Sequence, residues 1–318
     1  MTPSDVIRPG TVAVLGATGG IGRQVSALFS RAGHEVIGVA RQLAPHAAGH
    51  PFVALDVAAA EPAEIAALLG SRKVRLVVNA TGGWAVTEEA MYHAHVRLVD
   101  RMLAAVATLP VRPRVVHIGS IHEYGFVPPG TSIDETLATD PSTPYARTKL
   151  AGSQAVLDAA RAGDVDGVVL RAVNVCGPYP SEASFLGAVL HRLRGMAPGE
   201  RLELMIADAA RDYIDVRDVA SAVLRAAERA ASGAVFNIGR GAAPTMRELV
   251  TTLVEVAGFP PDTIKETGGP VESKGGGWTK ADIRHAERVL GWRPAIGLRD
   301  SLRDMWETWD RPPSPGPR

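Results

Sequence analysis

Cysteine is almost missing from this sequence. Cys176 is the only cysteine in 318 residues, so an intramolecular disulfide and a metal cluster held by several cysteines are both excluded. A chain without disulfides fits a reducing compartment. We therefore predict a cytoplasmic protein without a metal site.

Net charge and long hydrophobic runs are missing as well. Lysine and arginine together number 34, as do aspartate and glutamate, so no overall field attracts nucleic acid or an anionic membrane. No run approaches the roughly 18 apolar residues of a membrane helix, and residues 1–10 lack the apolar centre of a signal peptide. These absences favour a protein that binds a small molecule through local groups.

The first two-thirds of the chain alternates short β-branched segments with longer segments rich in alanine and leucine. This alternation is typical of βαβ units and predicts an α/β protein, a Rossmann fold with a doubly wound parallel sheet. Strands are expected at 12–15, 35–39, 52–55, 75–79, 114–118 and 167–170. Helices are expected at about 20–32, 61–69, 88–108 and 144–162.

The rest of the chain is predicted to form a smaller C-terminal substrate lobe. Glycine and proline predict a loop at 174–180, a flexible surface loop at 267–277 and a disordered tail at 310–318. Later helices are expected at about 183–194, 216–230 and from Thr245, with a strand at 235–238. The expected domains are the Rossmann domain at 1–173, with about 212–238 returning to it, and the lobe mainly at 174–309.

A glycine-rich turn follows the first predicted strand. Gly16-Ala-Thr-Gly19-Gly-Ile-Gly22 has three glycines spaced three apart and runs into a helix-compatible segment. Glycines at this place permit a tight turn and close approach of a pyrophosphate to the helix N-terminus. An ordinary glycine-rich turn is the alternative. The predicted cofactor contacts of this turn are Gly16, Thr18, Gly19, Gly20, Ile21 and Gly22.

The end of the second predicted strand bears on the choice of cofactor. A carboxylate there binds the ribose 2′-hydroxyl of NAD, whereas a basic side chain neutralises the 2′-phosphate of NADP. Arg41 occupies this place without a carboxylate beside it, so NADP(H) is favoured over NAD(H). Arg23 is a second candidate for the phosphate, and a solvated Arg41 is the alternative. Asp56 is predicted to bind the adenine amino group, or else to cap a helix.

Tyr145 and Lys149 are the predicted catalytic pair. Thr143 and Pro144 predict a helix start just before them, so residues four apart lie on one helical face. The chain has only five tyrosines and five lysines, so this pairing is seldom expected by chance. An ammonium close to a phenol lowers its pKa from about 10 toward working pH.

Ser120, at the end of the fifth predicted strand, completes the predicted catalytic set. Its hydroxyl would donate a second hydrogen bond to the substrate oxygen. Ligands of parallel sheets bind at such carboxyl ends of strands. Lys149 is also expected to hydrogen-bond the nicotinamide ribose.

These residues and four later motifs resemble the extended short-chain dehydrogenase/reductase family, the NAD-dependent epimerase/dehydratase group. The resemblance runs from about Thr11 to Leu302 and implies an enzyme that acts on nucleotide-linked sugars. The later motifs are Asn174-Val-Cys-Gly-Pro178, Arg211-Asp-Tyr-Ile-Asp-Val-Arg-Asp-Val219, Phe236-Asn-Ile-Gly239 and Leu290-Gly-Trp-Arg-Pro294.

The resemblance also implies roles for individual residues. Asn174 and Arg211 would contact the diphosphate of a nucleotide-sugar, which suits the planar guanidinium of arginine. A salt bridge from Arg211 to Asp212 or Asp215 is the alternative. Helices at about 88–108 and 144–162 are similar to those that pair in the family's dimers, which implies a homodimer. Further cofactor contacts implied are Val57, Ala80 and Thr81.

The sequence departs from the family at several positions. Ile121 and His122 stand where 4,6-dehydratases carry Asp and Glu, so the acid for dehydration is missing. Glu123 is expected to point elsewhere if the segment is extended. His122 is predicted to line the substrate pocket or to relay a proton, with a structural histidine as the alternative. Other departures are Gly119 in place of a serine, His95 in place of an asparagine, and 270–278 in place of an Arg-Pro-Gly-Asp segment.

These features predict an NADPH-dependent ketoreductase of a nucleotide-linked 4-keto-6-deoxysugar, with Tyr145 as the general acid. The alternatives are an NAD-dependent nucleotide-sugar 4-epimerase, a reductase of another carbonyl compound, and a non-enzymatic NADP(H) sensor. A sensor would be expected to lack the tyrosine or the lysine, and both are present here.

Overall fold

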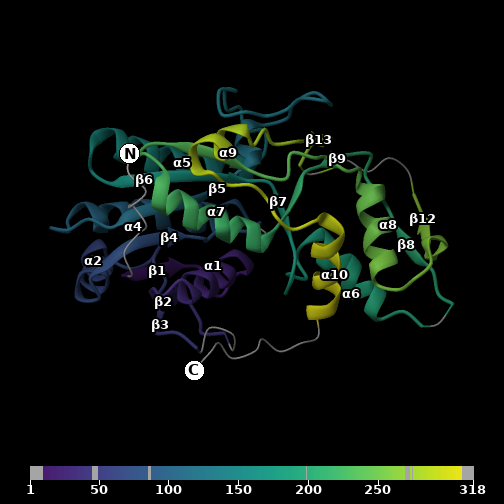
Figure 1. The fold of residues 1–318 in the computed structure, drawn as a ribbon, viewed down its shortest axis with the longest axis horizontal. Helices are drawn as coiled ribbons and strands as arrows, with labels where there is room; N and C mark the ends of the chain where they lie inside the picture. The colour runs from purple at the N-terminus through teal and green to yellow at the C-terminus, as the bar shows by residue number, and fades with distance from the viewer. Residues whose placement is uncertain are drawn as a thin grey trace.

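A parallel sheet of seven strands forms the centre of the protein (Figure 1). The structure is a computed structural model that describes residues 10–44, 49–84, 87–197, 199–268, 273 and 275–309. The strand order is β11-β6-β5-β4-β1-β2-β3. The strands are β1 (Thr11–Leu15), β2 (Glu35–Ala40), β3 (Phe52–Ala54), β4 (Val74–Asn79), β5 (Arg114–Ser120), β6 (Asp166–Ala172) and β11 (Val235–Ile238).

Helices cover both faces of this sheet because its strands are apolar on both sides. Along β1, Val12 and Val14 pack into one core and Ala13 and Leu15 into the other, as expected from the alternation of side chains along a strand. One face is covered by α1 (Gly20–Arg31), α7 (Val216–Arg229) and α9 (Arg284–Leu290). The other is covered by α2 (Pro62–Ser71), α4 (Leu98–Ala107) and α5 (Pro144–Ala162).

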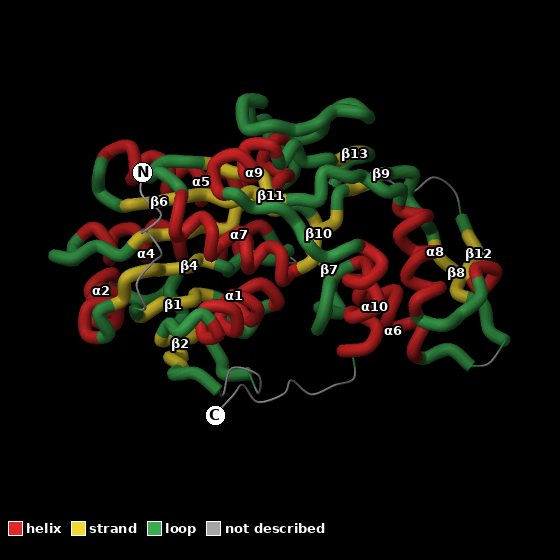
Figure 2. The backbone as a smooth tube through the Cα atoms, in the orientation of Figure 1, coloured by secondary structure: helices red, strands yellow, loops and turns green. Residues whose placement is uncertain are grey.

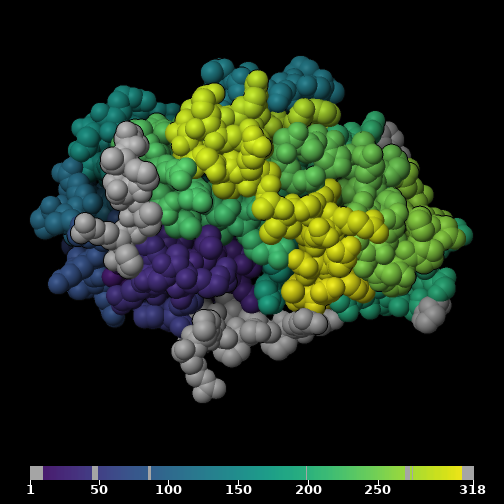
Figure 3. All heavy atoms as spheres, viewed as in Figure 1, coloured from purple at the N-terminus to yellow at the C-terminus, as the bar shows by residue number. Residues whose placement is uncertain are grey.

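A smaller apolar cluster builds the lobe beyond the carboxyl edge of the sheet (Figure 2). It lies among α6 (Phe185–Arg194), α8 (Met246–Val256) and α10 (Leu298–Thr308). In the space-filling view α9 lies over the Rossmann part and α10 over the lobe (Figure 3). The part of the chain after β6 also contains three short pairs of parallel strands. They are β7 (Asn174–Cys176) with β10 (Tyr213–Asp215), β8 (Leu202–Leu204) with β12 (Ile264–Glu266), and β9 (Ala210–Arg211) with β13 (Trp278–Thr279).

The predicted α/β Rossmann class is confirmed, and two local predictions are wrong. Residues 174–176 form β7 rather than a loop, because they find a partner in β10 nearly forty residues later. The segment expected as one helix at 88–108 is divided into α3 (Glu88–Tyr92), a π-helical turn (His93–Arg97) and α4. The predicted tail at 310–318 lies outside the described residues. None of the described helices is long and apolar enough to cross a membrane.

Candidate active site

The glycine turn after β1 is built around two tight contacts. Gly16 has a φ of +77°, which favours glycine, and a Cβ there would lie 3.0 Å from the Ala80 carbonyl oxygen and from Thr81 Cγ2. A Cβ on Gly22 would lie only 2.1 Å from the Gly16 carbonyl oxygen. The turn therefore packs against itself and against the end of β4.

This turn fits the diphosphate of a dinucleotide. Helix α1 begins at Gly20, and its N-cap residue Gly19 provides no capping side chain, so the first amides of the helix are left for a ligand. No side chain covers the turn at Gly20, where a Cβ would meet nothing within 4 Å. The turn leaves room for a ligand at the start of α1, and the binding of the diphosphate by Gly16–Gly22 stays a prediction.

The residues predicted to bind the adenosine end of the cofactor lie at the ends of β2 and β3. Arg41 directly follows β2, is exposed, and has no hydrogen bond or ion pair with any residue in the described ranges. Asp56 accepts a hydrogen bond from the Ala58 amide at 3.1 Å and lies 3.2 Å from His93 Nε2. Val57 is buried in the core. Asp56 thus caps a turn and not a helix, because the residue at the N-cap of α2 is Glu61; the alternative of a helix cap is wrong, and the adenine contact stays a prediction.

Arg23 is engaged elsewhere. Its guanidinium carbon lies 3.3 Å from the centre of the Tyr179 ring, which joins α1 to the segment after β7. Burial lowers the pKa of Arg23, and Tyr179 opposes this shift. Arg41 is therefore the better placed of the two arginines proposed for a 2′-phosphate.

The three predicted catalytic residues meet at the carboxyl edge of the sheet. Ser120 is the last residue of β5, and Tyr145 and Lys149 follow one another on the first turns of α5. The Thr143 hydroxyl caps α5 by accepting from the Ala146 amide, as predicted. Lys149 is buried, and its ammonium donates to the Ile118 carbonyl at 2.6 Å.

The pKa of Tyr145 departs from the prediction. Burial raises it to about 12, a hydrogen bond with Ser120 opposes this, and the charge of Glu123 adds to it. Burial lowers the pKa of Lys149 to about 8, against the opposing effect of Glu123. The expected lowering of the Tyr145 pKa is absent because desolvation of the buried phenol outweighs the effect of Ser120.

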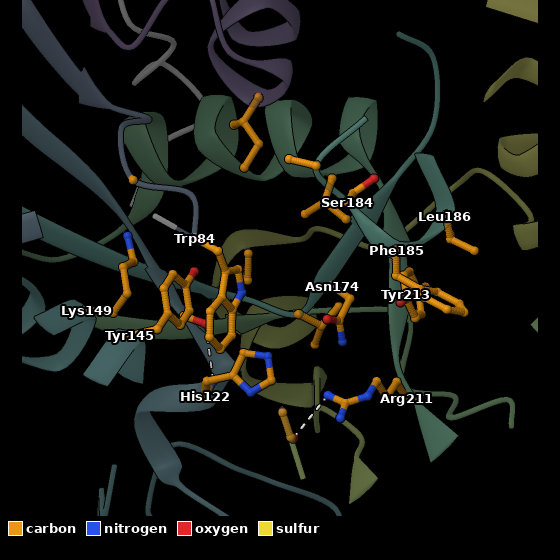
Figure 4. A pocket seen from close by; sticks show the side chains of 18 of the residues that line it. Trp84, His122, Tyr145, Lys149, Asn174, Ser184, Phe185, Leu186, Arg211 and Tyr213 are labelled. Atoms are coloured by element: carbon orange, nitrogen blue, oxygen red, sulfur yellow. Dashed lines mark hydrogen bonds between the residues drawn. The ribbon is translucent and has the colours of Figure 1, made fainter. Parts of the chain in front are cut away.

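The predicted substrate residues lie on the other side of Tyr145 (Figure 4). His122 is hydrogen-bonded to Asn174, and burial together with the nearby Arg211 charge lowers its pKa to about 4. Its imidazole is therefore neutral at neutral pH. The ring centres of His122 and Tyr145 are 6.2 Å apart, so the histidine lines the pocket rather than the core.

Arg211 does not form the salt bridge considered as its alternative role. Its guanidinium donates to the Gly275 carbonyl at 3.0 Å and also bonds to the Ser273 hydroxyl and the Gly276 carbonyl. Part of the segment predicted as a flexible surface loop is thus folded over this arginine. All three acceptors are neutral, and no ion pair joins Arg211 to a carboxylate among the residues that the structure describes.

One cavity of about 590 Å³ brings these groups together. The cofactor-side residues Ile21, Ala80 and Thr81 line it with Ser120, Tyr145 and Lys149, and with His122, Asn174 and Arg211. Of the described residues that line it, none is an aspartate or a glutamate. The cavity therefore offers a proton donor, neutral hydrogen-bonding groups, one lysine and one arginine.

Several lining residues were not predicted from the sequence. The indole of Trp84 stacks on the Tyr145 ring at 4.3 Å between centres and an interplanar angle of 11°. Its place just beyond β4, in a loop at the carboxyl edge, was the only available signal. The other unpredicted residues are mostly apolar and come from the lobe: Phe185, Leu186, Met205, Tyr213 and Met246.

The positions that depart from the family are explained by local geometry. Ile121–Tyr124 form a 3₁₀ turn, so the extended-segment argument for Glu123 was wrong. Glu123 is nevertheless outside the cavity, because the turn directs it into the interior. His95, in the π-helical turn, lies 2.8 Å from the Thr148 hydroxyl, with its ring centre 5.5 Å from that of Tyr145. Such turns are frequent at functional sites.

Comparison with known sequences identifies the family. Residues 12–239 match the NAD dependent epimerase/dehydratase family. The chain is 39% identical over 302 residues to a dTDP-6-deoxy-L-talose 4-dehydrogenase (NAD(P)(+)) of Kitasatospora kifunensis, covering 94% of this chain and 95% of that protein. It is 29% identical over 204 residues to a GDP-6-deoxy-D-mannose reductase of Pseudomonas aeruginosa, covering 61% of this chain and 65% of that one.

A solved structure has the same fold. MoeE5 in complex with UDP-glucuronic acid and NAD superposes with a TM-score of 0.81 and 27% identity, covering 94% of this chain and 98% of that one. All three relatives are named for a nucleotide-linked sugar or are bound to one, and two of them are named with NAD or NADP.

Proposed function

Because the chain belongs to the NAD-dependent epimerase/dehydratase family, as an NAD(P)-dependent oxidoreductase, we propose that it is an NADPH-dependent ketoreductase of a nucleotide-linked 4-keto-6-deoxysugar. One observation carries the proposal: Ser120, Tyr145 and Lys149 line a cavity in which the described residues include no carboxylate. Hydride transfer with proton transfer from a phenol needs no carboxylate, whereas dehydration needs an acid for the departing hydroxyl.

The chain's own residues divide the work of reduction. Gly16–Gly22 would hold the dinucleotide, which when bound would supply the hydride. Ser120 and Tyr145 orient the carbonyl oxygen by hydrogen bonds, and Tyr145 gives its proton to that oxygen as it becomes a hydroxyl. The raised pKa of Tyr145 keeps the phenol protonated at neutral pH, which is the state that reduction requires. Lys149, one helical turn further along α5, lines the same cavity and would hydrogen-bond the nicotinamide ribose.

The other end of the cavity fits the nucleotide diphosphate. Arg211 and Asn174 line it, and the guanidinium of Arg211 now bonds to carbonyl and hydroxyl groups that phosphate oxygens can replace with stronger, charge-assisted bonds. The similar Kitasatospora enzyme is named for the 4-dehydrogenation of dTDP-6-deoxy-L-talose. A sugar of this kind is the alcohol that reduction of a 4-keto-6-deoxysugar would form.

The direct test is a cofactor-oxidation assay. Incubation with NADPH and dTDP-4-keto-6-deoxyglucose should consume the absorbance of the reduced cofactor and form one alcohol per NADPH. A 4-epimerase would instead release stoichiometric NAD on denaturation and show no net oxidation of added NADPH. No oxidation across several nucleotide-linked 4-ketosugars would refute the reductase assignment.

The cofactor preference is tested at Arg41. Arg41→Glu should raise KM for NADPH by about 10- to 100-fold, because a charged hydrogen bond to the 2′-phosphate contributes about 1.5–3 kcal/mol. KM for NADH should change much less. Arg72→Glu, equally exposed but at the opposite edge of the sheet, is the matched control. An equal rise in both KM values would show that Arg41 does not select the phosphate.

A further inference from the structure

A buried carboxylate lies directly beneath the proposed catalytic serine. Glu123 is 0% exposed. Its Oε1 accepts from the Ser120 amide at 2.7 Å and from the Ser153 hydroxyl at 2.8 Å, and its Oε2 accepts from Arg171 Nε at 2.7 Å. One side chain thus ties together β5, α5 and β6 at the edge where the cavity begins.

The Glu123 carboxylate occupies space that a side chain at Gly119 would otherwise fill. A Cβ on Gly119 would lie 2.5 Å from Glu123 Oε1 and 2.8 Å from Ser153 Oγ. The glycine that replaces the family's serine here therefore makes room for the carboxylate beneath the strand end. Burying the Glu123 carboxylate costs desolvation free energy. The ion pair with Arg171 and the hydrogen bonds from Ser120 and Ser153 offset this cost.

Ser120 is held by reciprocal hydrogen bonds in this turn. Its amide donates to Glu123, and its own hydroxyl oxygen accepts from the His122 amide at 3.3 Å. Because the serine's backbone and side chain are both fixed, its hydroxyl is kept at the wall of the cavity that Tyr145 also lines. Loss of the Glu123 acceptor would free the strand end.

The negative charge of Glu123 acts on the pKa values of both Lys149 and Tyr145. Burial lowers the pKa of Lys149 and Glu123 opposes this; burial raises the pKa of Tyr145 and Glu123 adds to it. The other titratable or charged groups around Glu123 and Lys149 are Arg171 on β6, Tyr124 in the 3₁₀ turn, His117 on β5 and His95 in the π-helical turn. Burial and the Lys149 charge lower the pKa of both histidines, so Glu123 is the anion of this group.

We propose that Glu123 is a positioning residue of the active site: it fixes Ser120 through its amide, two residues along β5 from the Ile118 carbonyl that holds the Lys149 ammonium. Arg171 and Ser153 hold the carboxylate in place. The inference rests on the proposed roles of Ser120, Tyr145 and Lys149, but it does not depend on the identity of the substrate.

The test measures the proton affinity of Lys149 without a substrate. Trace labelling with acetic anhydride across a pH range, followed by mass spectrometry of peptides, reports the fraction of neutral amine at each lysine, with the exposed Lys73 as internal reference. Lys149 lines the cavity, so the reagent can reach it. Glu123→Gln should move the Lys149 midpoint to lower pH by about one unit, because an opposing charge is removed.

Turnover gives a second readout. The alkaline limb of kcat/KM for ketone reduction should move to lower pH in Glu123→Gln, since both Lys149 and Tyr145 then lose their protons more easily. We expect kcat to fall by about tenfold, as for a misplaced hydrogen-bonding group, with KM for NADPH unchanged. Absence of turnover in the wild type would refute the reductase assignment alone, because the labelling midpoint still decides the role of Glu123.

Two variants separate this role from a merely structural one. Glu123→Gln leaves Arg171 buried without its partner, so its Tm should fall. Glu123→Gln with Arg171→Met removes both charges and recovers stability, and its Lys149 midpoint should lie between those of Glu123→Gln and the wild type. Asp166→Asn breaks the Arg114–Asp166 pair at the other ends of β5 and β6 and should lower Tm without moving the midpoint. An unchanged Lys149 midpoint in folded Glu123→Gln would overturn the proposal.

Discussion

Tyr145→Phe should lower kcat/KM for ketone reduction by about 10²- to 10⁴-fold, the usual contribution of a positioned proton donor. Phenylalanine keeps the ring that stacks on Trp84, so the packing of the site is preserved and only the hydroxyl is lost. The affinity for NADPH should change by no more than a few-fold. Steady-state kinetics with saturating NADPH, together with a fluorescence titration of NADPH binding, would measure both quantities.

The matched control for this variant is Tyr213→Phe. Tyr213 lines the same cavity, and burial raises its pKa to about 12 as it does for Tyr145. It lies on β10 rather than on α5, without Ser120 as a hydrogen-bonding partner. Its loss should therefore cost less than about tenfold in kcat/KM, the effect of one non-catalytic contact. A Tyr145→Phe enzyme as active as Tyr213→Phe would remove Tyr145 from the mechanism.

Gly22→Ala should raise the Kd for NADPH by about 100-fold or more, equivalent to about 2.7 kcal/mol. A Cβ at this position would lie 2.1 Å from the Gly16 carbonyl oxygen and 2.9 Å from Ala17 Cα. Both are backbone atoms that cannot rotate away, so the start of α1 must move off β1. The amides that would receive the diphosphate move with it.

The added methyl group should also lower stability, by about 1–3 kcal/mol for an overpacked site. Gly70→Ala, in α2, is the control variant. A Cβ at Gly70 would meet only Leu109 Cδ2, at a van der Waals distance of 3.4 Å. That variant should leave Kd unchanged and stabilise the helix slightly. Equal NADPH affinities in the two variants would show that the turn at Gly16–Gly22 does not hold the cofactor.

Much of the Rossmann part was predictable because its signals are local. Strands such as β4 and β5 are runs of apolar residues whose pattern is complete within one segment. Tyr145 and Lys149 are joined by a single helix, so their spacing alone places them on one face. Gly16–Gly22 form a turn whose conformation depends on neighbours in the sequence.

Residues whose partners are distant in the chain were predicted less well. Strand β7 could not be recognised from its own residues, because three residues with a glycine and prolines after them become a strand only by pairing with β10. The neighbours of Arg211 are 62 to 65 residues away, so a salt bridge to a nearby aspartate was kept as the alternative. Glu123 was set aside on the alternation of side chains in an extended segment, because its partners Ser153 and Arg171, which are 30 and 48 residues away, give no local signal.

Tyr145 and Lys149 show the same difference between local signals and tertiary contacts. The sequence by itself determined that Tyr145 and Lys149 lie together on α5 and that Ser120 ends the strand beside them, since helix period and strand ends are local properties. Only the tertiary structure decided their proton affinities, because the pKa of a group depends on how much water and which charges surround it. Those surroundings come from β5, β6 and the π-helical turn, which folding alone brings to the pair.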